Sequence, residues 1–331
     1  MADTVVGLMI VEECVRAAEV RRPGSKHPTL VRYGETSLPA GAAGDSEILD
    51  SDAVALALRQ LWADARFSTK RVVLGLASRR ILVRDHKAPR LPLDQIRRAL
   101  PFQVQDMLPV PVDEAVLDFY PVAEEEDDVR GLLVVAVADM IAEVIETVRK
   151  AKLTVDTVDL APFGLVRAAA RRVDPEKTVL VAHVGAHTSF LVVMRNGAPL
   201  LTRIVPGGVP VQPSESGRHR ADPDLLPASV SAAGGSVQDP SDDRLVEEFA
   251  MRVRGTADFY VGRAGGKLDE LYVCGEGACH QQVLPALDRL VGVPSKQLSV
   301  DDVVTAARSV DTGSGCLSLV TPVGLALRGG A

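Results

Sequence analysis

The chain has 331 residues, of which 47% are hydrophobic and 24% charged, so the sequence predicts about two globular domains and excludes a disordered chain. The formal net charge of −7 gives no basic patch, and nucleic acid is therefore not expected as a partner. No run reaches the roughly 20 apolar residues of a membrane-spanning helix, and the four cysteines do not form a disulfide framework. The N-terminus shows no secretory-signal pattern, so we expect a cytoplasmic protein.

The first half of the chain is predicted to alternate strands and helices. Apolar runs and turn signals indicate strands at 5–11, 14–20, 29–33, 71–76, 80–84, 115–122 and 131–138. Helical spacing predicts helices over 50–65 and 93–108, the second of which must kink or restart at Pro101. Asp139 is predicted to cap the helix after the last of these strands, and a short strand and a helix follow within 153–170. The acidic run 124–128 is expected to be a solvated hairpin tip.

The second half repeats the opening pattern of the first. Strands are predicted at 179–184, 190–194, 200–205 and 271–274, with Asn196-Gly197 as a type I′ turn. Helices are predicted over 245–260, 281–290 and 317–327. Residues 211–243 are rich in Pro, Ser, Gly and Asp without periodicity, so we expect a mobile loop. A three-stranded meander followed by helices thus occurs twice, which indicates an internal duplication.

A duplicated meander with helices resembles the α/β, ribonuclease H-like fold of actin, Hsp70 and the sugar kinases. The middle of the chain resembles more specifically the PilM family of type IV pilus assembly proteins, relatives of the cell-division actin homologue FtsA. The segments that carry this resemblance are LDQIRRAL at 93–100, VQDMLPVPVDEAVLD at 104–118, VDLAPF at 158–163 with Arg167, RIVPGG at 203–208 and GLALR at 324–328. The resemblance covers essentially the whole chain except the expected loop.

The resemblance implies an actin-like, duplicated two-lobe ATPase fold with an FtsA-type inserted subdomain. The first lobe would comprise 1–84 and 153–177, with the inserted subdomain at 85–152. The second lobe would comprise 178–315, with a disordered loop at about 211–243, and a C-terminal helix at 316–331 would return to the first lobe.

The resemblance also implies a scaffold function. Family members bind the short cytoplasmic N-terminal tail of the membrane protein PilN, and so lie at the inner face of the plasma membrane. They link other pilus platform proteins to the motor ATPase. An extended peptide of this kind needs backbone edges and apolar pockets. We expect them where the first lobe meets the inserted subdomain, lined by Phe102, Met107, Leu108, Val110, Leu117 and Phe119, with core packing as the alternative for each.

Actin-like nucleotide sites use two tight turns whose amides cradle the phosphates, each with an Asp that holds hydrated Mg²⁺. In the first turn, GLMIVEE, Gly7 is kept, but Met9 stands at the Asp position and Val11 at a Gly position. Glu12 and Glu13 occupy the place of the phosphate oxygens, and two like charges about 4 Å apart repel by roughly 1 to 4 kcal/mol. One alternative is that Glu12 replaces the missing Asp.

The second turn, HVGAHTS at 183–189, has also lost its Asp. His183 stands in its place and His187 follows, whereas Gly185 and Thr188 are kept. Because both metal carboxylates are missing, ATP and Mg²⁺ are not expected as cofactors, and no catalytic residue is assigned.

The adenosine turn of such a site is kept only in part, as Gly275 and Gly277. The helix that should follow Gly207 and Gly208 is replaced by the 211–243 loop. Hydrolysis of ATP is therefore not expected, and nucleotide binding is doubtful.

Other candidate chemistry is weak. His183 and His187 flank a turn and lack an evident third ligand, so no metal site is assigned. Cys274 and Cys279 lack metal-site spacing and are expected to be buried, and the apolar stripe around Trp62 is expected to be core. Two rival functions stay open: an ATP-binding actin-like switch or phosphotransferase, and a scaffold of the related type II secretion platform.

Overall fold

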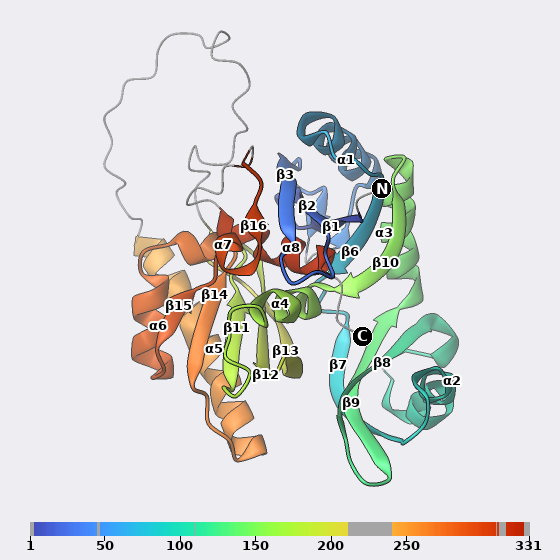
Figure 1. Cartoon of the computed structure of the whole chain (residues 1–331), viewed down its shortest axis with the longest axis vertical. Coiled ribbons are helices and arrows are strands. Elements are labelled where there is room, and N and C mark those ends of the chain that lie inside the picture. The colour runs from blue at the N-terminus through green and yellow to red at the C-terminus, as the bar shows by residue number, and fades with distance from the viewer. Residues whose placement is uncertain are drawn as a thin grey trace.

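The computed structural model describes residues 3–44, 47–108, 110–210, 240–308, 310 and 316–327. Its described strands form two large sheets, a three-stranded sheet and a short two-stranded ribbon. In Figure 1 the sheet of the N-terminal half, the first lobe, lies above and beside the three-stranded sheet, and the sheet of the C-terminal half, the second lobe, lies across from both. Residues 211–239 of the predicted mobile loop lie outside the described residues.

The sheet of the first lobe has the strand order β10-β6-β1-β2-β3-β16. Strand β1 pairs antiparallel with β2 and parallel with β6, so the predicted meander continues into a parallel half-sheet. The strands are β1 (Thr4–Ile10), β2 (Cys14–Arg21), β3 (Thr29–Ser37), β6 (Arg71–Leu76), β10 (Thr154–Leu160) and β16 (Thr305–Ala306), and the ribbon is β4 (Ala43–Gly44) with β5 (Glu47–Ile48).

The sheet of the second lobe repeats this plan with the order β13-β12-β11-β14-β15. Strand β11 pairs antiparallel with β12 and parallel with β14, as β1 does with β2 and β6. The duplication predicted from the sequence is therefore present in the pairing itself. The strands are β11 (Val179–His183), β12 (Thr188–Arg195), β13 (Ala198–Pro206), β14 (Glu270–Cys274) and β15 (Ser295–Gln297).

Both central strands are buried on both faces because helices cover each side of their sheets. Alternate residues enter different cores: Val6 and Leu8 of β1 pack toward α1 and α3, whereas Met9 packs toward α4 and α8. The helices are α1 (Ser51–Ala65), α2 (Leu93–Val104), α3 (Ala138–Lys150), α4 (Ala161–Ala169), α5 (Pro240–Ala264), α6 (Val283–Val291), α7 (Val300–Val303) and α8 (Val320–Ala326). Among the described residues, no helix has the length and apolar run needed to cross a bilayer.

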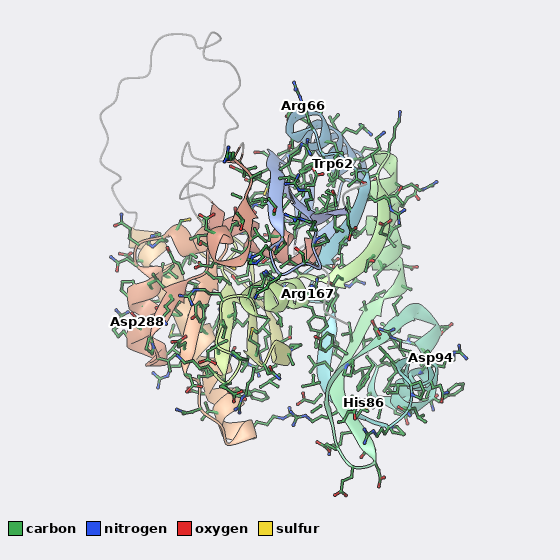
Figure 2. All side chains as sticks on the ribbon, in the orientation of Figure 1. Trp62, Arg66, His86, Asp94, Arg167 and Asp288 are labelled. Atoms are coloured by element: carbon green, nitrogen blue, oxygen red, sulfur yellow. The ribbon has the colours of Figure 1, made fainter. Side chains whose placement is uncertain are left out.

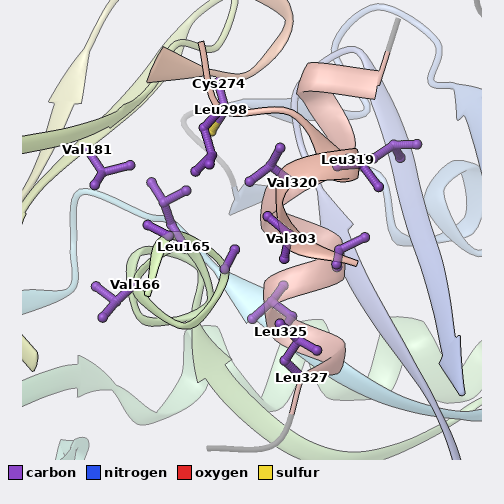
Figure 3. Packing of buried hydrophobic residues seen from close by; sticks show 14 of the residues in the cluster. Leu165, Val166, Val181, Cys274, Leu298, Val303, Leu319, Val320, Leu325 and Leu327 are labelled. Atoms are coloured by element: carbon purple, nitrogen blue, oxygen red, sulfur yellow. The ribbon is translucent and has the colours of Figure 1, made fainter. Parts of the chain in front are cut away.

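Helices α4 and α8 lie side by side between the two large sheets and form the central core (Figure 3). Their backbones approach so closely that a Cβ on Gly324 would lie 2.0 Å from the carbonyl oxygen of Gly164. Arg167 of α4, near the centre of Figure 2, donates to the carbonyl of Gly324 at 3.1 Å and pairs with Asp159. The two lobes are thus joined through one continuous core.

The three-stranded sheet has its own small core and order β7-β9-β8. Helix α2 covers it with Ile96, Leu100 and Val104, all buried. Arg263 of α5 pairs with Asp85 at 2.8 Å, which connects this sheet to the second lobe. Helix α3 instead packs its apolar side into the core of the first lobe. The strands are β7 (Leu82–Pro89), β8 (Ala115–Glu124) and β9 (Asp128–Val137).

Three local expectations are corrected. Of the two alternatives at Pro101, a kink or a restart, the restart is wrong, because α2 runs through the proline and ends at Val104. The buried stripe on either side of Pro101 offsets the missing hydrogen bond. Asp139 is no cap: β9 runs on to Val137, so the carboxylate lies in the first turn of α3, where it still favours the helix dipole. Residues 240–243, expected in the loop, belong to α5.

Candidate functional site

Two turns, one from each lobe, face each other across the cleft between the large sheets. The β1–β2 turn carries Glu12 and Glu13, and the β11–β12 turn carries Gly185 and His187. The sequence predicted both turns as the remnants of phosphate-binding loops, and the structure does bring them together.

In the first turn, the amide of Val11 is not free to bind a phosphate. Val11 donates its amide to the carbonyl of Cys14 at 3.0 Å, which closes the hairpin. Met9, at the position where an Asp would hold a metal, is buried in the central core. Packing requires a glycine at position 7, because a Cβ there would lie 2.0 Å from the carbonyl oxygen of Pro322 on α8.

Gly185 of the second turn uses its amide and its carbonyl internally. The amide of Gly185 donates to Ser189 Oγ at 3.2 Å, and its carbonyl accepts from Val209 at 2.9 Å. Gly207 donates its amide to the carbonyl of His187 at 2.6 Å. A Cβ on Gly208 would lie 1.8 Å from the carbonyl oxygen of Gly185, so this glycine too serves close packing.

The third predicted turn packs against the end of β11 in the same way. Gly277 donates its amide to the carbonyl of Val184 at 2.9 Å. Gly275 adopts a φ of +91°, and a Cβ there would lie 2.4 Å from that same carbonyl oxygen. Both glycines therefore hold the turn against β11.

The first two turns contact each other directly. His187 Nε2 lies 2.8 Å from Glu13 Oε1. The hydroxyl of Thr188 donates to Glu12 Oε1 at 3.2 Å. The acidic side chains of the first lobe thus reach the second lobe at the place where phosphates would lie in an actin-like site.

Behind these contacts lies a buried ion pair that also joins the lobes. Arg16 of β2 donates to Glu276 at 2.7 Å and to Glu35 of β3. Burial opposes ionisation of Glu276, but the Arg16 guanidinium, His183 and a backbone hydrogen bond together outweigh burial and lower the pKa of Glu276. Arg16 was not predicted, although an arginine flanked on both sides by apolar residues of one strand is the signal that could have identified it.

His183 is a neutral structural histidine. Burial lowers its pKa to about 4. Its ring stacks on Phe190 with centroids 4.5 Å apart, and Nδ1 lies 3.0 Å from the hydroxyl of Thr321. Cys274 is buried beside it, as expected, and burial raises the pKa of the thiol well above its usual range. Cys279 is exposed, contrary to expectation.

The space left in the cleft between the turns is about 10 Å³, close to what a single water molecule needs. Pockets for small-molecule ligands have volumes of about 300 to 1,000 Å³. Burial raises the pKa of Glu13, and although His187 lowers it, the carboxylates of Glu276 and Glu12 raise it again, so negative charge on Glu13 is disfavoured in the cleft. As the structure stands, these residues do not fit a magnesium triphosphate.

The six residues predicted to line a peptide groove do not all face outward. Phe119 is only 1% exposed and lies in the core under α2, so it offers no surface to a partner. Phe102 is 82% exposed and Met107 43% exposed. Leu108, Val110 and Leu117 are half-buried. The sequence did not identify two further exposed apolar residues nearby in the chain, Leu91 and Val116, because apolar spacing alone does not tell an exposed residue from a buried one.

Comparison with known proteins identifies the family. The model of the family described as "Type IV pilus assembly protein PilM" matches residues 7–211, more than half of the chain. No protein among the curated sequences matches it. A solved structure described as "PilM-PilN type IV pilus biogenesis complex" superposes with a TM-score of 0.79 at 21% identity, covering 98% of this chain and 97% of the other.

A second solved structure is the ethanolamine utilization protein EutJ of Carboxydothermus hydrogenoformans. It superposes with a TM-score of 0.54 at 13% identity, covering 99% of this chain and 91% of the other. At such identities these likenesses concern the fold, and the expected actin-like, two-lobe α/β fold is confirmed. Together with the family match, they show that this chain belongs to the PilM family of type IV pilus assembly proteins.

Proposed function

We propose that this protein is a non-catalytic scaffold of type IV pilus assembly that binds the cytoplasmic N-terminal tail of a PilN-like inner-membrane protein. The observation that carries the proposal is the direct contact of the two turns across the cleft, His187 with Glu13 and Thr188 with Glu12. A fold that has closed its nucleotide site retains its outer surfaces for binding other proteins.

Nucleotide entry would require several changes at once. Both contacts between the turns must break, and the carboxylates of Glu12 and Glu13 must swing away from the incoming phosphates. At about 4 Å, each pair of like charges repels by roughly 1 kcal/mol in water and about 4 kcal/mol at an effective dielectric near 20. Neither turn offers an Asp to bring in a compensating Mg²⁺, since Met9 and His183 stand there and both are buried.

The three-stranded sheet and α2 provide the candidate surface for the partner. An extended peptide is bound by side-chain pockets and by the free edge of a sheet. Strands β7 and β8 are the two edges of this sheet, and Phe102 and Met107 stand exposed beside it. A contiguous exposed apolar patch marks an interaction site, and we propose that these side chains belong to one. Half-buried Leu108, Val110 and Leu117 would provide the walls.

The scaffold would act at the inner face of the plasma membrane. In this account the protein lies in the cytoplasm and is held at the membrane by the tail of its partner. The match to a PilM–PilN complex supports such a partner. Other pilus platform proteins and the motor ATPase would then bind surfaces that the tail leaves free.

Titration with a synthetic peptide tests the proposal. The peptide carries the first twelve residues of the PilN-like protein encoded by the same organism, and calorimetry on the full chain is expected to give saturable 1:1 binding. Phe102→Asp is expected to weaken it at least tenfold. Leu56→Asp, an exposed apolar residue on α1, is the matched control and should leave it unchanged. A flat titration with the unmodified chain, or equal effects of the two variants, would contradict the proposal.

A further inference from the structure

The contact between the two turns gathers three metal-ligating side chains from the two lobes. One oxygen from each of Glu12 and Glu13 and one ring nitrogen of His187 all lie within 4.8 Å of one another. His187 Nε2 lies 2.8 Å from Glu13 Oε1. We propose that Glu12, Glu13 and His187 bind a divalent transition-metal ion of the zinc type, which clamps the two lobes together without any nucleotide.

The spacing suits a single ion. Bonds from zinc to nitrogen or oxygen are about 2.0 to 2.2 Å, so two ligand atoms of a tetrahedral site lie roughly 3.4 Å apart. Small side-chain rotations would bring all three atoms to this spacing. The cleft space of about 10 Å³ beside them is enough for a water molecule as the fourth ligand.

A second, independent feature is the state of Glu13 Oε1. This atom is shut off from solvent, and no group in the described part of the chain forms a hydrogen bond to it. Nε2 of His187 is close to it but does not meet hydrogen-bond geometry. A buried carboxylate oxygen without a donor is unfavourable. An ion between the oxygen and the nitrogen would satisfy both atoms.

The donor set selects the class of ion. Mg²⁺ prefers oxygen ligands in octahedral geometry, whereas imidazole nitrogen favours zinc, cobalt or nickel. The site is therefore distinct from the magnesium of an actin-like nucleotide site, whose carboxylates are missing here. Because the imidazole of His187 is 61% exposed, an ion can enter from solvent.

The expected consequence is a stiffer junction between the lobes. The β1–β2 turn belongs to the first lobe and the β11–β12 turn to the second, so one ion bonded to both turns opposes their separation. An ion that binds only the folded chain raises the melting temperature, and at saturating zinc we expect a rise of roughly 5 °C.

The test uses the full chain treated with a chelator and then dialysed. Titration with zinc chloride is expected to give one equivalent of binding and the rise in melting temperature, whereas magnesium chloride should give neither. Cobalt chloride should give the visible absorption of a tetrahedral site. Glu13→Gln and His187→Gln are expected to weaken zinc binding at least tenfold. Both side chains are partly exposed, so the variants should fold.

His86→Gln is the matched control. His86 lies on the three-stranded sheet, away from the cleft (Figure 2), and its substitution should leave zinc binding intact. Absence of a zinc-dependent shift, or zinc binding that survives both Glu13→Gln and His187→Gln, would overturn the proposal. The outcome is separate from that of the peptide titration, because Glu13→Gln and His187→Gln lie in the cleft and not on the candidate peptide surface.

Discussion

The candidate site residues of the interlobe cleft contact residues of the opposite lobe, whereas those beside the three-stranded sheet are exposed to solvent. In the cleft, side chains of the two lobes meet one another: Arg16 donates to Glu276, Thr188 donates to Glu12, and His187 Nε2 lies 2.8 Å from Glu13 Oε1. At the three-stranded sheet, Phe102 and Met107 stand exposed. In the proposed scaffold, pairing of polar groups would have turned an ancestral site into a structural junction, and recognition would take place on the surface that is left uncovered. Substitutions in the cleft should then change stability, and substitutions on the sheet should change binding.

The largest effect is expected at the buried ion pair. Arg16→Met leaves Glu276 charged and buried without its partner, which should lower the free energy of unfolding by about 3 to 5 kcal/mol. Arg71→Met breaks an exposed pair with Asp156 and should cost less than about 1 kcal/mol. Urea denaturation measures both. Equal, small losses would show that the cleft is not held by this pair.

The next effect tests whether the glycines of the turns serve packing or a ligand. In Gly208→Ala the new Cβ would meet the carbonyl oxygen of Gly185, so we expect a loss of roughly 2 kcal/mol. Gly255→Ala in α5 has open space around it and should stabilise the chain by about 0.5 to 1 kcal/mol. An unchanged thermal midpoint for Gly208→Ala would contradict the packing role.

The buried histidine predicts a pH dependence of similar size. The unfolded chain takes up a proton at His183 below about pH 6.5, whereas in the folded chain the pKa of this imidazole is about 4. The free energy of unfolding therefore has its full value above pH 6.5 and falls as the pH drops toward 4. At pH 5 this histidine lowers it by about 2 kcal/mol. Denaturation of His183→Gln between pH 7 and pH 5 should lack this component. Parallel curves for the two proteins would refute the assignment.

The smallest effect on stability is expected at the exposed face of α2, beside the three-stranded sheet. Phe102→Ser removes a side chain that is mostly in water, so the free energy of unfolding should change by less than about 0.5 kcal/mol. If this surface binds the tail of a partner, the same substitution should reduce peptide affinity. A large loss of stability would instead assign Phe102 to packing and remove the contrast between the two regions.

Much of the fold could be predicted from the sequence because it rests on local patterns. The two meanders follow from apolar runs, and the Asn196-Gly197 turn follows from the positive φ angles that both residues adopt. The missing Asp residues at Met9 and His183 were also evident. The contacts that close the cleft were not, because His187 and Glu13 are far apart in the sequence and only the paired sheets bring them together.

The sequence also did not predict which apolar side chains are buried and which are exposed. Phe102 of α2 and Phe119 of β8 are the same residue type, yet one is exposed and the other lies in the core. The difference arises because β8 turns Phe119 under α2, while Phe102 lies on the outward side of that helix. A pattern of apolar residues predicts a helix or a strand, but the side that faces solvent depends on what packs against it.

Calorimetric titration of the full chain with Mg-ATP tests the closed cleft most directly. We expect no measurable heat of binding up to high micromolar nucleotide, because the space between the turns is only about 10 Å³ and is lined by Glu12 and Glu13. Saturable binding with a micromolar dissociation constant would contradict it and would favour an ATP-binding, actin-like switch.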